Sequence, residues 1–384
     1  MSYCFDRCPD RSATESSKWR KVPGGVIPLW LADMDFTCPP EVIQALHERV
    51  DHGIFGYGMP LPEVYEAVVD FVYEAHGWKI EPEWVVFVPG VVTGFNLAVE
   101  ATCRPGDAML VQPPVYPPIL CAPADRRLAA RWAPLVDNGS GRCEVDFDRF
   151  EQAMAPETAY FLLCNPHNPV GRVFERAELE RMAEICLRHN TLILSDEIHS
   201  DIVYSGHRHI PIASLDPEVA ARTFTFIAPS KTFNIAGLKC SVAIIPDREL
   251  RERFEAGRRG LVDSVNVMGL TAAMAAYRSG MPWLRELLVY LEGNRDCLAR
   301  FVAEELPGVR MNLPEGTFLA WLDFRQAGLP ENASAYLEKN GVALNDGNSF
   351  GDTSGGFVRL NFGCPRDTLM EALLRIKRAL AQLG

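Results

Sequence analysis

The sequence lacks the features that mark a secreted or membrane-spanning protein. Its N-terminal stretch, residues 1–21, contains no apolar segment of the kind found in a secretory signal. No uninterrupted apolar run in the 384 residues is long enough to cross a bilayer. The eleven cysteines are odd in number and form no C-x-x-C pair, which predicts reduced thiols with neither a disulfide framework nor a bound metal. We therefore expect a cytoplasmic protein.

An excess of positive charge is also missing. The 38 Lys and Arg residues are outnumbered by 50 Asp and Glu residues, so the formal net charge is −12. This balance argues against binding to nucleic acid or to an anionic membrane surface. It leaves small anionic ligands open, because backbone amides and a few local cations can hold a phosphate. The 48% of hydrophobic residues is ordinary for a chain that buries a sizeable core.

Apolar strands alternate with helices through the middle of the chain. The predicted strands are 85–88, 108–112, 160–164, 191–195, 223–227 and 241–245. Continuous apolar strands of this kind predict a mainly parallel, mixed sheet covered by helices on both faces. After Gly280 the pattern changes to long amphipathic helices and two further strands. We therefore predict an α/β fold with a large domain over 48–283 and a smaller α/β domain made of 1–47 and 284–384.

Lys231 follows the predicted strand 223–227, within the run APSKTFNIAGL (228–238). Ligands of parallel α/β sheets bind beyond the carboxyl ends of the strands. A lysine desolvated there can lose its proton and form a Schiff base with a carbonyl group. Taken alone, a Ser-Lys pair after a strand is usually exposed and inert. Its interpretation depends on which residues accompany it.

Other candidate catalytic or binding residues also follow or lie within predicted strands. They are Tyr116, Asn168, Asp196 and Arg359, with the amides of Gly90, Val91 and Val92 opening a helix. Each alone has a structural interpretation as a turn, cap, packing or ion-pair residue. Together they fit pyridoxal 5'-phosphate: a carboxylate for the ring nitrogen, an amide for the ring hydroxyl, an aromatic ring to stack, a helix N-terminus for the phosphate and an arginine for the substrate carboxylate.

The sequence resembles fold-type I pyridoxal-phosphate enzymes of the aminotransferase class I/II superfamily. More narrowly, it resembles the MalY/PatB family of cystathionine β-lyases, which are carbon–sulfur lyases. The matching runs are WLADMDF (30–36), DHGIFGYGMP (51–60), PGVVT (89–93), QPPVYPP (112–118), CNPHNPVGR (164–172), SDEIHSDIVY (195–204), APSKTFNIAGL (228–238) and RLNFGC (359–364). They span most of the chain, and their combination is specific although no single run is.

The resemblance implies roles for the residues that line the cofactor ring and the substrate. Lys231 matches the lysine that forms the Schiff base, and Asp196 matches the partner of the pyridine nitrogen. Asn168 matches the residue that bonds the ring hydroxyl. Tyr116 matches the residue that stacks on the ring beside the substrate, and Arg359 matches the arginine that binds the substrate carboxylate.

The resemblance also implies a phosphate site and a dimer. Gly90, Val91, Val92 and Ser230 fall where the family binds the cofactor phosphate. Tyr57 matches a tyrosine that reaches the phosphate of the neighbouring subunit's cofactor. A homodimer with shared active sites is therefore expected.

Three further positions differ from the aminotransferase pattern or have two interpretations. His199 stands where typical aminotransferases have a tyrosine, as in the β-lyase branch, and is a cofactor-binding or a packing residue. Lys239 stands where aminotransferases often have an arginine that grips the phosphate. Asp33 follows a predicted short strand in the WLADMDF run and lies near the substrate or is structural.

The function that the resemblance implies is β-elimination from an L-amino acid with a sulfur leaving group. L-Cystathionine would give homocysteine, pyruvate and ammonia, with Lys231 as the base that removes the α-proton. One alternative is an aminotransferase on the same fold, which shares the cofactor and the first proton transfer. A further alternative is a regulatory protein that uses the fold to bind a partner.

Overall fold

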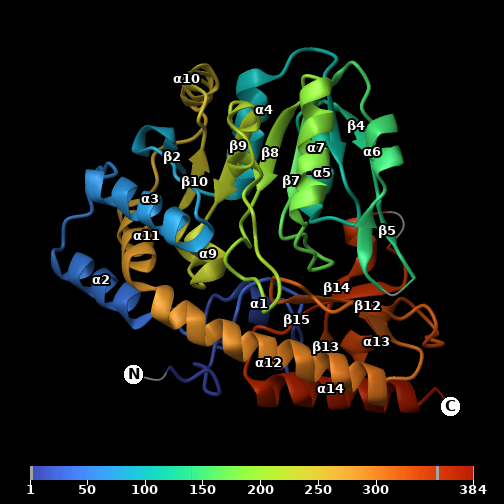
Figure 1. Cartoon of the computed structure of the whole chain (residues 1–384). Helices are drawn as coiled ribbons and strands as arrows, with labels where there is room; N and C mark the ends of the chain where they lie inside the picture. Colours follow the sequence, from blue (N-terminus) through green and yellow to red (C-terminus); the bar gives the residue numbers. More distant parts are fainter. Residues whose placement is uncertain (1–2, 140, 352–353, 384) are drawn as a thin grey trace.

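A computed structural model describes residues 3–139, 141–351 and 354–383, and a seven-stranded sheet lies at its centre (Figure 1). The strands follow the order β2-β10-β9-β8-β7-β3-β4. Their bounds are β2 (Val85–Val88), β3 (Ala108–Val111), β4 (Ala129–Trp132), β7 (Thr158–Cys164), β8 (Leu192–Asp196), β9 (Thr223–Ile227) and β10 (Ser241–Ile244). Within this sheet only β10 runs antiparallel to its neighbours, which confirms the predicted mixed, mainly parallel sheet.

The direction of the strands brings many chain segments to one edge of the sheet. Because β2 and β9 both pair antiparallel to β10, β2 points the same way as the parallel strands. The carboxyl ends of β2, β3, β7, β8 and β9 therefore share an edge. The sequence prediction needed this arrangement, because it placed the site residues just after these strands. The loops that leave this edge face the smaller sheet below it in Figure 1.

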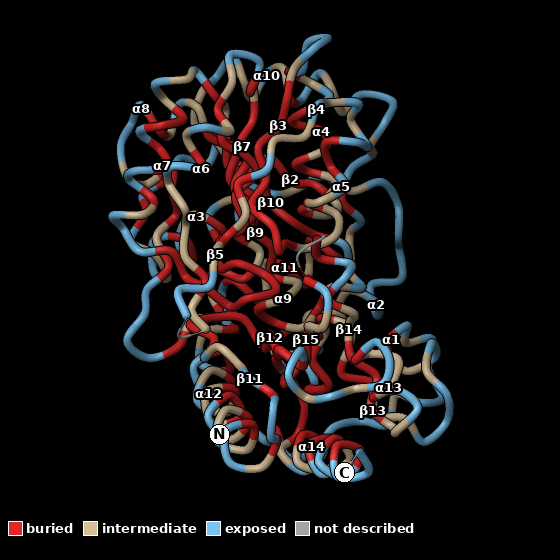
Figure 2. Tube along the Cα trace, turned by 90° about the vertical axis from the view of Figure 1, so that its right-hand side faces the viewer, coloured by how far each residue is buried: buried red, intermediate tan, exposed pale blue. Residues whose placement is uncertain are grey.

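Helices cover both faces of the large sheet, and alternate strand residues point to opposite faces. In β7, Tyr160 and Leu162 join the cluster under one set of helices, whereas Phe161 and Leu163 join the cluster under the other. The helices over the first face are α4 (Val91–Thr102), α5 (Pro117–Asp125) and α10 (Arg248–Gly257). Those over the second include α6 (Phe147–Gln152), α7 (Arg176–Arg188) and α8 (Pro217–Ala220). Figure 2 shows the strands as the most buried part of the molecule.

The C-terminal part forms a second layer around a four-stranded antiparallel sheet of order β11-β12-β15-β14. Its elements are α12 (Met281–Glu305), β11 (Arg310–Met311), β12 (Leu319–Asp323), α13 (Ala333–Lys339), β13 (Val342–Ala343), β14 (Asn345–Asp346), β15 (Phe357–Asn361) and α14 (Arg366–Ala381). The N-terminal β1 (Ile27–Pro28) pairs in parallel with β13, so the first segment of the chain joins this part. Two smaller pieces are α1 (Ser17–Arg20) and the hairpin β5 (Leu135–Asp137) with β6 (Cys143–Val145).

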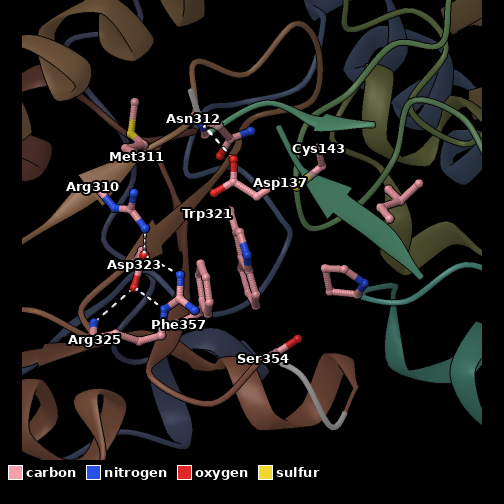
Figure 3. A pocket seen from close by; sticks show the side chains of 13 residues that line it. Asp137, Cys143, Arg310, Met311, Asn312, Trp321, Asp323, Arg325, Ser354 and Phe357 are labelled. Atoms are coloured by element: carbon pink, nitrogen blue, oxygen red, sulfur yellow. Dashed lines mark hydrogen bonds and ion pairs between the residues drawn. The ribbon is translucent and has the colours of Figure 1, made fainter. Parts of the chain in front are cut away.

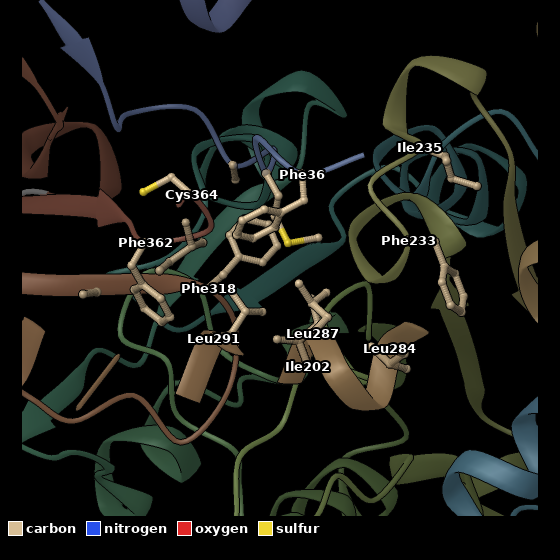
Figure 4. Packing of buried hydrophobic residues seen from close by; sticks show 14 of the residues in the cluster. Phe36, Ile202, Phe233, Ile235, Leu284, Leu287, Leu291, Phe318, Phe362 and Cys364 are labelled. Atoms are coloured by element: carbon tan, nitrogen blue, oxygen red, sulfur yellow. The ribbon is translucent and has the colours of Figure 1, made fainter. Parts of the chain in front are cut away.

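One large apolar cluster connects the two parts. It contains Phe36 from the N-terminal segment, Phe233 from the lysine loop, Leu287 from α12 and Phe318 beside β12 (Figure 4). The helices α2 (Pro40–Asp51), α3 (Pro62–His76) and α11 (Val267–Ser279) contribute to the same layer, and α2 packs against α11. The structure also has four short 3₁₀ turns: η1 (Pro82–Trp84), η2 (Ile212–Ser214), η3 (Ala236–Leu238) and η4 (Gly347–Phe350).

The predicted strand 223–227 coincides with β9. The strand expected before Asp33 is shorter than expected, because only Ile27–Pro28 forms ladder pairs. The predicted domain boundaries fall within helices, residue 48 in α2 and residue 283 in α12, and the division of the chain stays a prediction. Among the residues that the structure describes, no helix is long and apolar enough to cross a membrane.

Candidate active site

A cavity of about 440 Å³ lies at the shared carboxyl edge of the strands, which is a typical size for a cofactor site. It is lined by the predicted site residues Gly90, Val91, Val92, Tyr116, Asn168, Asp196, His199, Ser230, Lys231, Lys239 and Arg359. Only Tyr57 and Asp33 of the predicted set are missing from its lining. Segments that lie far apart in the sequence thus converge on one cavity.

Lys231 lies on the short helix α9 (Pro229–Thr232), directly after β9. Its Nζ reaches across to the N-terminal segment and donates to the carbonyl oxygen of Ala32. Burial lowers the pKa of Lys231 to about 8, an effect that the nearby charge of Asp33 partly opposes. Roughly a tenth of this amine is therefore neutral at pH 7, far more than for an exposed lysine. A neutral amine is the form that attacks a carbonyl or accepts a proton.

Asp196 is the last residue of β8, and only 3% of it is exposed. Its Oδ1 accepts a hydrogen bond of 3.1 Å from the amide of Ile198. Burial nevertheless raises the pKa of Asp196 to about 7, because the charged form loses its hydration. A cation at the cavity side of this carboxylate would restore its ionised form. The protonated nitrogen of a pyridine ring is such a cation.

Arg359 lies on β15 and is also 3% exposed. Its Nη1 donates to Oδ1 of Asn168 at 2.9 Å, and its Nη2 donates to the carbonyl of Trp30 at 2.9 Å. Its Nε has no partner among the described residues. Burial lowers the pKa of Arg359 to about 10, so the guanidinium remains charged. A buried cation with an unpaired donor beside the cavity suits a carboxylate ligand.

Three further predicted side chains line the cavity: Asn168, Tyr116 and His199. The Oδ1 of Asn168 is taken by the arginine, which leaves its NH₂ group as a donor for a ring hydroxyl. Tyr116 is the N-cap residue of α5, and burial followed by the charge of Asp196 raises its pKa. His199 is buried, and its pKa lies well below the ordinary value because of burial and the charges of nearby Lys231 and Arg359. Its imidazole is therefore neutral, and its Nδ1 has no partner among the described residues.

Another part of the cavity lining fits a phosphate. Helix α4 begins at Val91 after Gly90, and no side chain caps it, so its first amides and its dipole are available to an anion. Ser230 and Lys239 add a hydroxyl and an ammonium group to the same lining. Thr93 also lines the cavity, and the sequence prediction missed it. Its signal was its place as the third helical residue of the PGVVT run, directly after the predicted amides of Gly90, Val91 and Val92.

Comparisons with known proteins agree with this geometry. The family model described as aminotransferase class I and II matches residues 25–376. The chain belongs to this family. Cystathionine β-lyase PatB of Bacillus subtilis (strain 168) is 44% identical over 386 residues, covering 98% of this chain and 100% of the relative. Protein MalY of Escherichia coli (strain K12) is 33% identical, covering 98% of each chain. The solved structure of cystalysin from Treponema denticola, which contains pyridoxal 5'-phosphate, covers both chains fully with a TM-score of 0.95 at 33% identity.

Two of the predicted site residues, Tyr57 and Asp33, are not part of the cavity lining. Tyr57 is fully exposed, with a relative exposure of 107%, in the loop between α2 and α3. Asp33 is paired with Arg11 at 2.8 Å and lies 3.8 Å from the Nζ of Lys18. The roles given to Tyr57 and Asp33 stay predictions, as do the individual roles of the residues that line the cavity.

A second, smaller cavity of about 180 Å³ lies between the β5–β6 hairpin and the small sheet (Figure 3). Its lining includes none of the predicted site residues. Its carboxylate Asp323 is held by Arg310 at 2.7 Å and Arg325 at 2.9 Å, so these charges satisfy one another. Among the described residues, no group of three or more His, Cys, Asp or Glu side chains is arranged to hold a metal ion.

Proposed function

We propose that this chain is a pyridoxal-phosphate-dependent carbon–sulfur lyase that acts by β-elimination on L-amino acids with sulfur at Cβ. L-Cystathionine would give homocysteine, pyruvate and ammonia. The observation that carries the chemistry is the placement of a partly neutral Lys231 amine, the Asp196 carboxylate and the Arg359 guanidinium around one cavity. The choice of carbon–sulfur cleavage over amino transfer rests on the similarity to cystathionine β-lyase PatB over nearly the whole chain.

Bound pyridoxal phosphate would supply an aldehyde that joins the substrate amine and a protonated ring that delocalises the electron pair left at Cα. The residues of the chain supply the rest. Asp196 holds the proton on the ring nitrogen, because its ionised form needs that cation in a buried setting. Arg359 fixes the substrate carboxylate through its unpaired Nε side. The first turn of α4 and Ser230 hold the phosphate.

Lys231 performs the proton transfer. Its neutral amine removes the proton from Cα, and the electron pair of the Cα–H bond becomes the Cα–Cβ double bond as the Cβ–S bond breaks. Sulfur leaves with the electron pair of that bond as a thiolate. The Ala32 carbonyl accepts a hydrogen bond from Nζ and orients the amine before and after it takes the proton. His199 is neutral and adds no further cation to the cavity.

The test is a direct assay. Purified protein supplied with pyridoxal phosphate and L-cystathionine should release pyruvate and free thiol in equal amounts, and Lys231→Ala should abolish both. A parallel reaction adds a keto acid acceptor to L-cystathionine, which then serves as the amino donor. Amino transfer to the keto acid without pyruvate release would refute the lyase proposal and favour the aminotransferase alternative.

We further infer a homodimer in which Tyr57 reaches the partner's cofactor phosphate. Its support is the exposed apolar loop around Tyr57, which contains Ile54, Phe55, Met59 and Leu61 and has no cover within one chain. Mixing Tyr57→Phe with Lys231→Ala subunits would create one intact site in each mixed dimer, or about a quarter of all sites after random exchange. Activity that fails to recover on mixing would refute shared sites. A cytoplasmic location stays a prediction from the sequence.

A further inference from the structure

Residues 30–36, here called the strap, form no strand and contribute Leu31 and Ala32 to the lining of the cavity. The carbonyl of Trp30 accepts from Nη2 of Arg359 at 2.9 Å. The carbonyl of Ala32, two residues further on, accepts from Nζ of Lys231. The acceptor for the substrate-binding guanidinium and the acceptor for the base therefore lie on one short piece of backbone.

Two asparagines bond most of the remaining carbonyls of the strap and one of its amides. Asn361 follows Arg359 by two residues, and Asn234 follows Lys231 by three. Their partners, at 2.6 to 3.0 Å, are the carbonyls of Leu31, Asp33, Met34 and Phe36 and the amide of Met34. The strap is thus bonded to the lysine loop on one side and to the arginine strand on the other.

The outer side of the strap carries a cluster of paired charges, here called the clamp. Lys18 is fully buried, with Nζ 2.8 Å from Oδ2 of Asp35 and 3.2 Å from the carbonyl of Asp33. Arg11 bridges both carboxylates at 2.8 Å each. Two cations thus balance two carboxylates, which is the condition under which buried charges are tolerated. The proton transfer described above makes no use of these four side chains.

The end of the strap is held by apolar packing. Phe36 makes edge contacts with the rings of Phe5 at 5.2 Å and Tyr290 at 5.5 Å, within the cluster of Figure 4. This anchor fixes one end only. The segment that carries the Trp30 and Ala32 carbonyls lies on the other side of the clamp.

We propose that Arg11 and Lys18 are positioning residues of the active site, which fix the strap through Asp33 and Asp35 and so set the separation between the Lys231 amine and the Arg359 guanidinium. The proposal rests on the proposed function, because the base must reach the Cα of a substrate whose carboxylate is held by the arginine. That carboxylate is one bond from Cα, so the separation decides whether the amine meets the proton. A misplacement of about 1 Å costs on the order of 100-fold in rate. Asp33 is then a clamp residue rather than a substrate ligand.

The clamp also has an electrostatic consequence. After burial, the charge of Asp33 is the largest influence on the pKa of Lys231, and it raises that pKa. The other charged groups that face the amine are Asp196, which acts in the same direction, and Arg359 and Lys239, which oppose it. When Arg11 loses its positive charge, less of the negative charge of Asp33 is balanced, so Asp33 attracts the proton of the Lys231 amine more strongly. The amine then holds its proton more strongly.

The test uses the full-length chain with Arg11→Gln, the charge-preserving Arg11→Lys, and Arg248→Gln as a matched control. Arg248 is an exposed arginine that forms an ion pair with Glu252 on α10. The first readout is hydrogen–deuterium exchange of the strap and α9 in cofactor-free protein. The second is the rate at which acetic anhydride labels Lys231 at pH 7, measured by peptide mass spectrometry. The third is kcat and KM for L-cystathionine.

We expect Arg11→Gln to speed exchange in the strap and α9, to label Lys231 roughly three-fold more slowly, and to lower kcat while raising KM. Arg11→Lys should restore the labelling rate, and Arg248→Gln should match wild type throughout. If Arg11→Gln changes neither the hydrogen–deuterium exchange of the strap nor the labelling rate of Lys231, the proposal is overturned. It is also overturned if exchange in the remote helix α10 becomes faster by the same factor as in the strap. If wild type itself forms no pyruvate, the lyase proposal fails, while exchange and labelling still decide the clamp.

Discussion

Replacement of Asp196 by asparagine should make the cofactor-free protein more stable at pH 8. Burial raises the pKa of this carboxyl from its ordinary 3.8 to about 7. The folded chain therefore keeps a proton that the unfolded chain has already released, and the free energy of unfolding falls as pH rises from about 4 to 7. Above pH 7 the wild type carries a cost of up to roughly 4 kcal/mol that a neutral amide of the same shape avoids.

The measurement is urea unfolding of the cofactor-free wild type and Asp196→Asn at pH 4, 6 and 8. At pH 8 the free energy of unfolding of the variant should exceed that of the wild type. Near pH 4 this difference should vanish. Asp323→Asn is the matched control of opposite sign, because two arginines lower the pKa of Asp323 to about 2 despite its burial. That control should lose stability at pH 8. Equal or lower stability of Asp196→Asn at pH 8 would refute the view that this carboxylate awaits a cation.

Three further outcomes are expected. Arg359→Lys should raise KM for L-cystathionine at least ten-fold with a smaller change in kcat, because an ammonium cannot form the paired bonds of a guanidinium; an unchanged KM in steady-state kinetics would move the carboxylate site elsewhere. Labelling of Lys231 in cofactor-free protein should rise about ten-fold per pH unit below pH 8 and level off above it, and a rise that continues to pH 10 would contradict the lowered pKa. Gly94→Ala should lower the free energy of unfolding by about 1–3 kcal/mol, because the added Cβ would lie 2.8 Å from the ring of Phe226; thermal unfolding with an unchanged midpoint would show that the ring can shift.

The fold followed from the sequence where local pattern and tertiary setting agree. The run 223–227 is apolar and β-branched and forms the fully buried strand β9, and Lys231, which follows it, lies where parallel strands present their ligands. The shared edge then brought Asn168, Asp196 and Tyr116 to the same cavity. Their convergence needed no knowledge of loop conformation, because the direction of the strands decides it.

Other features of the site could not be predicted, because they depend on contacts between segments that no local sequence pattern indicates. The segment 30–36 reads as apolar residues with two acids, yet several of its carbonyls accept hydrogen bonds from side chains as far as 330 positions away, and it forms no strand. The pairing of Asp33 with Arg11 was equally invisible, because nothing in either short stretch marks the other as its partner. Thr93 was missed for a simpler reason: the prediction considered the amides of its helix and not its hydroxyl.

The pairing of β1 with β13 has a consequence for how the chain is made. Ile27 leaves the ribosome early, but its ladder partner Val342 is synthesised roughly 300 residues later. The large sheet can pair while translation continues, since its strands all lie between residues 85 and 244. Arg359 lies on β15, after nearly all other elements have emerged. A nascent or truncated chain can therefore contain Lys231 before Arg359 has been synthesised, so the proposed active site is complete only once the last fraction of the polypeptide has been made.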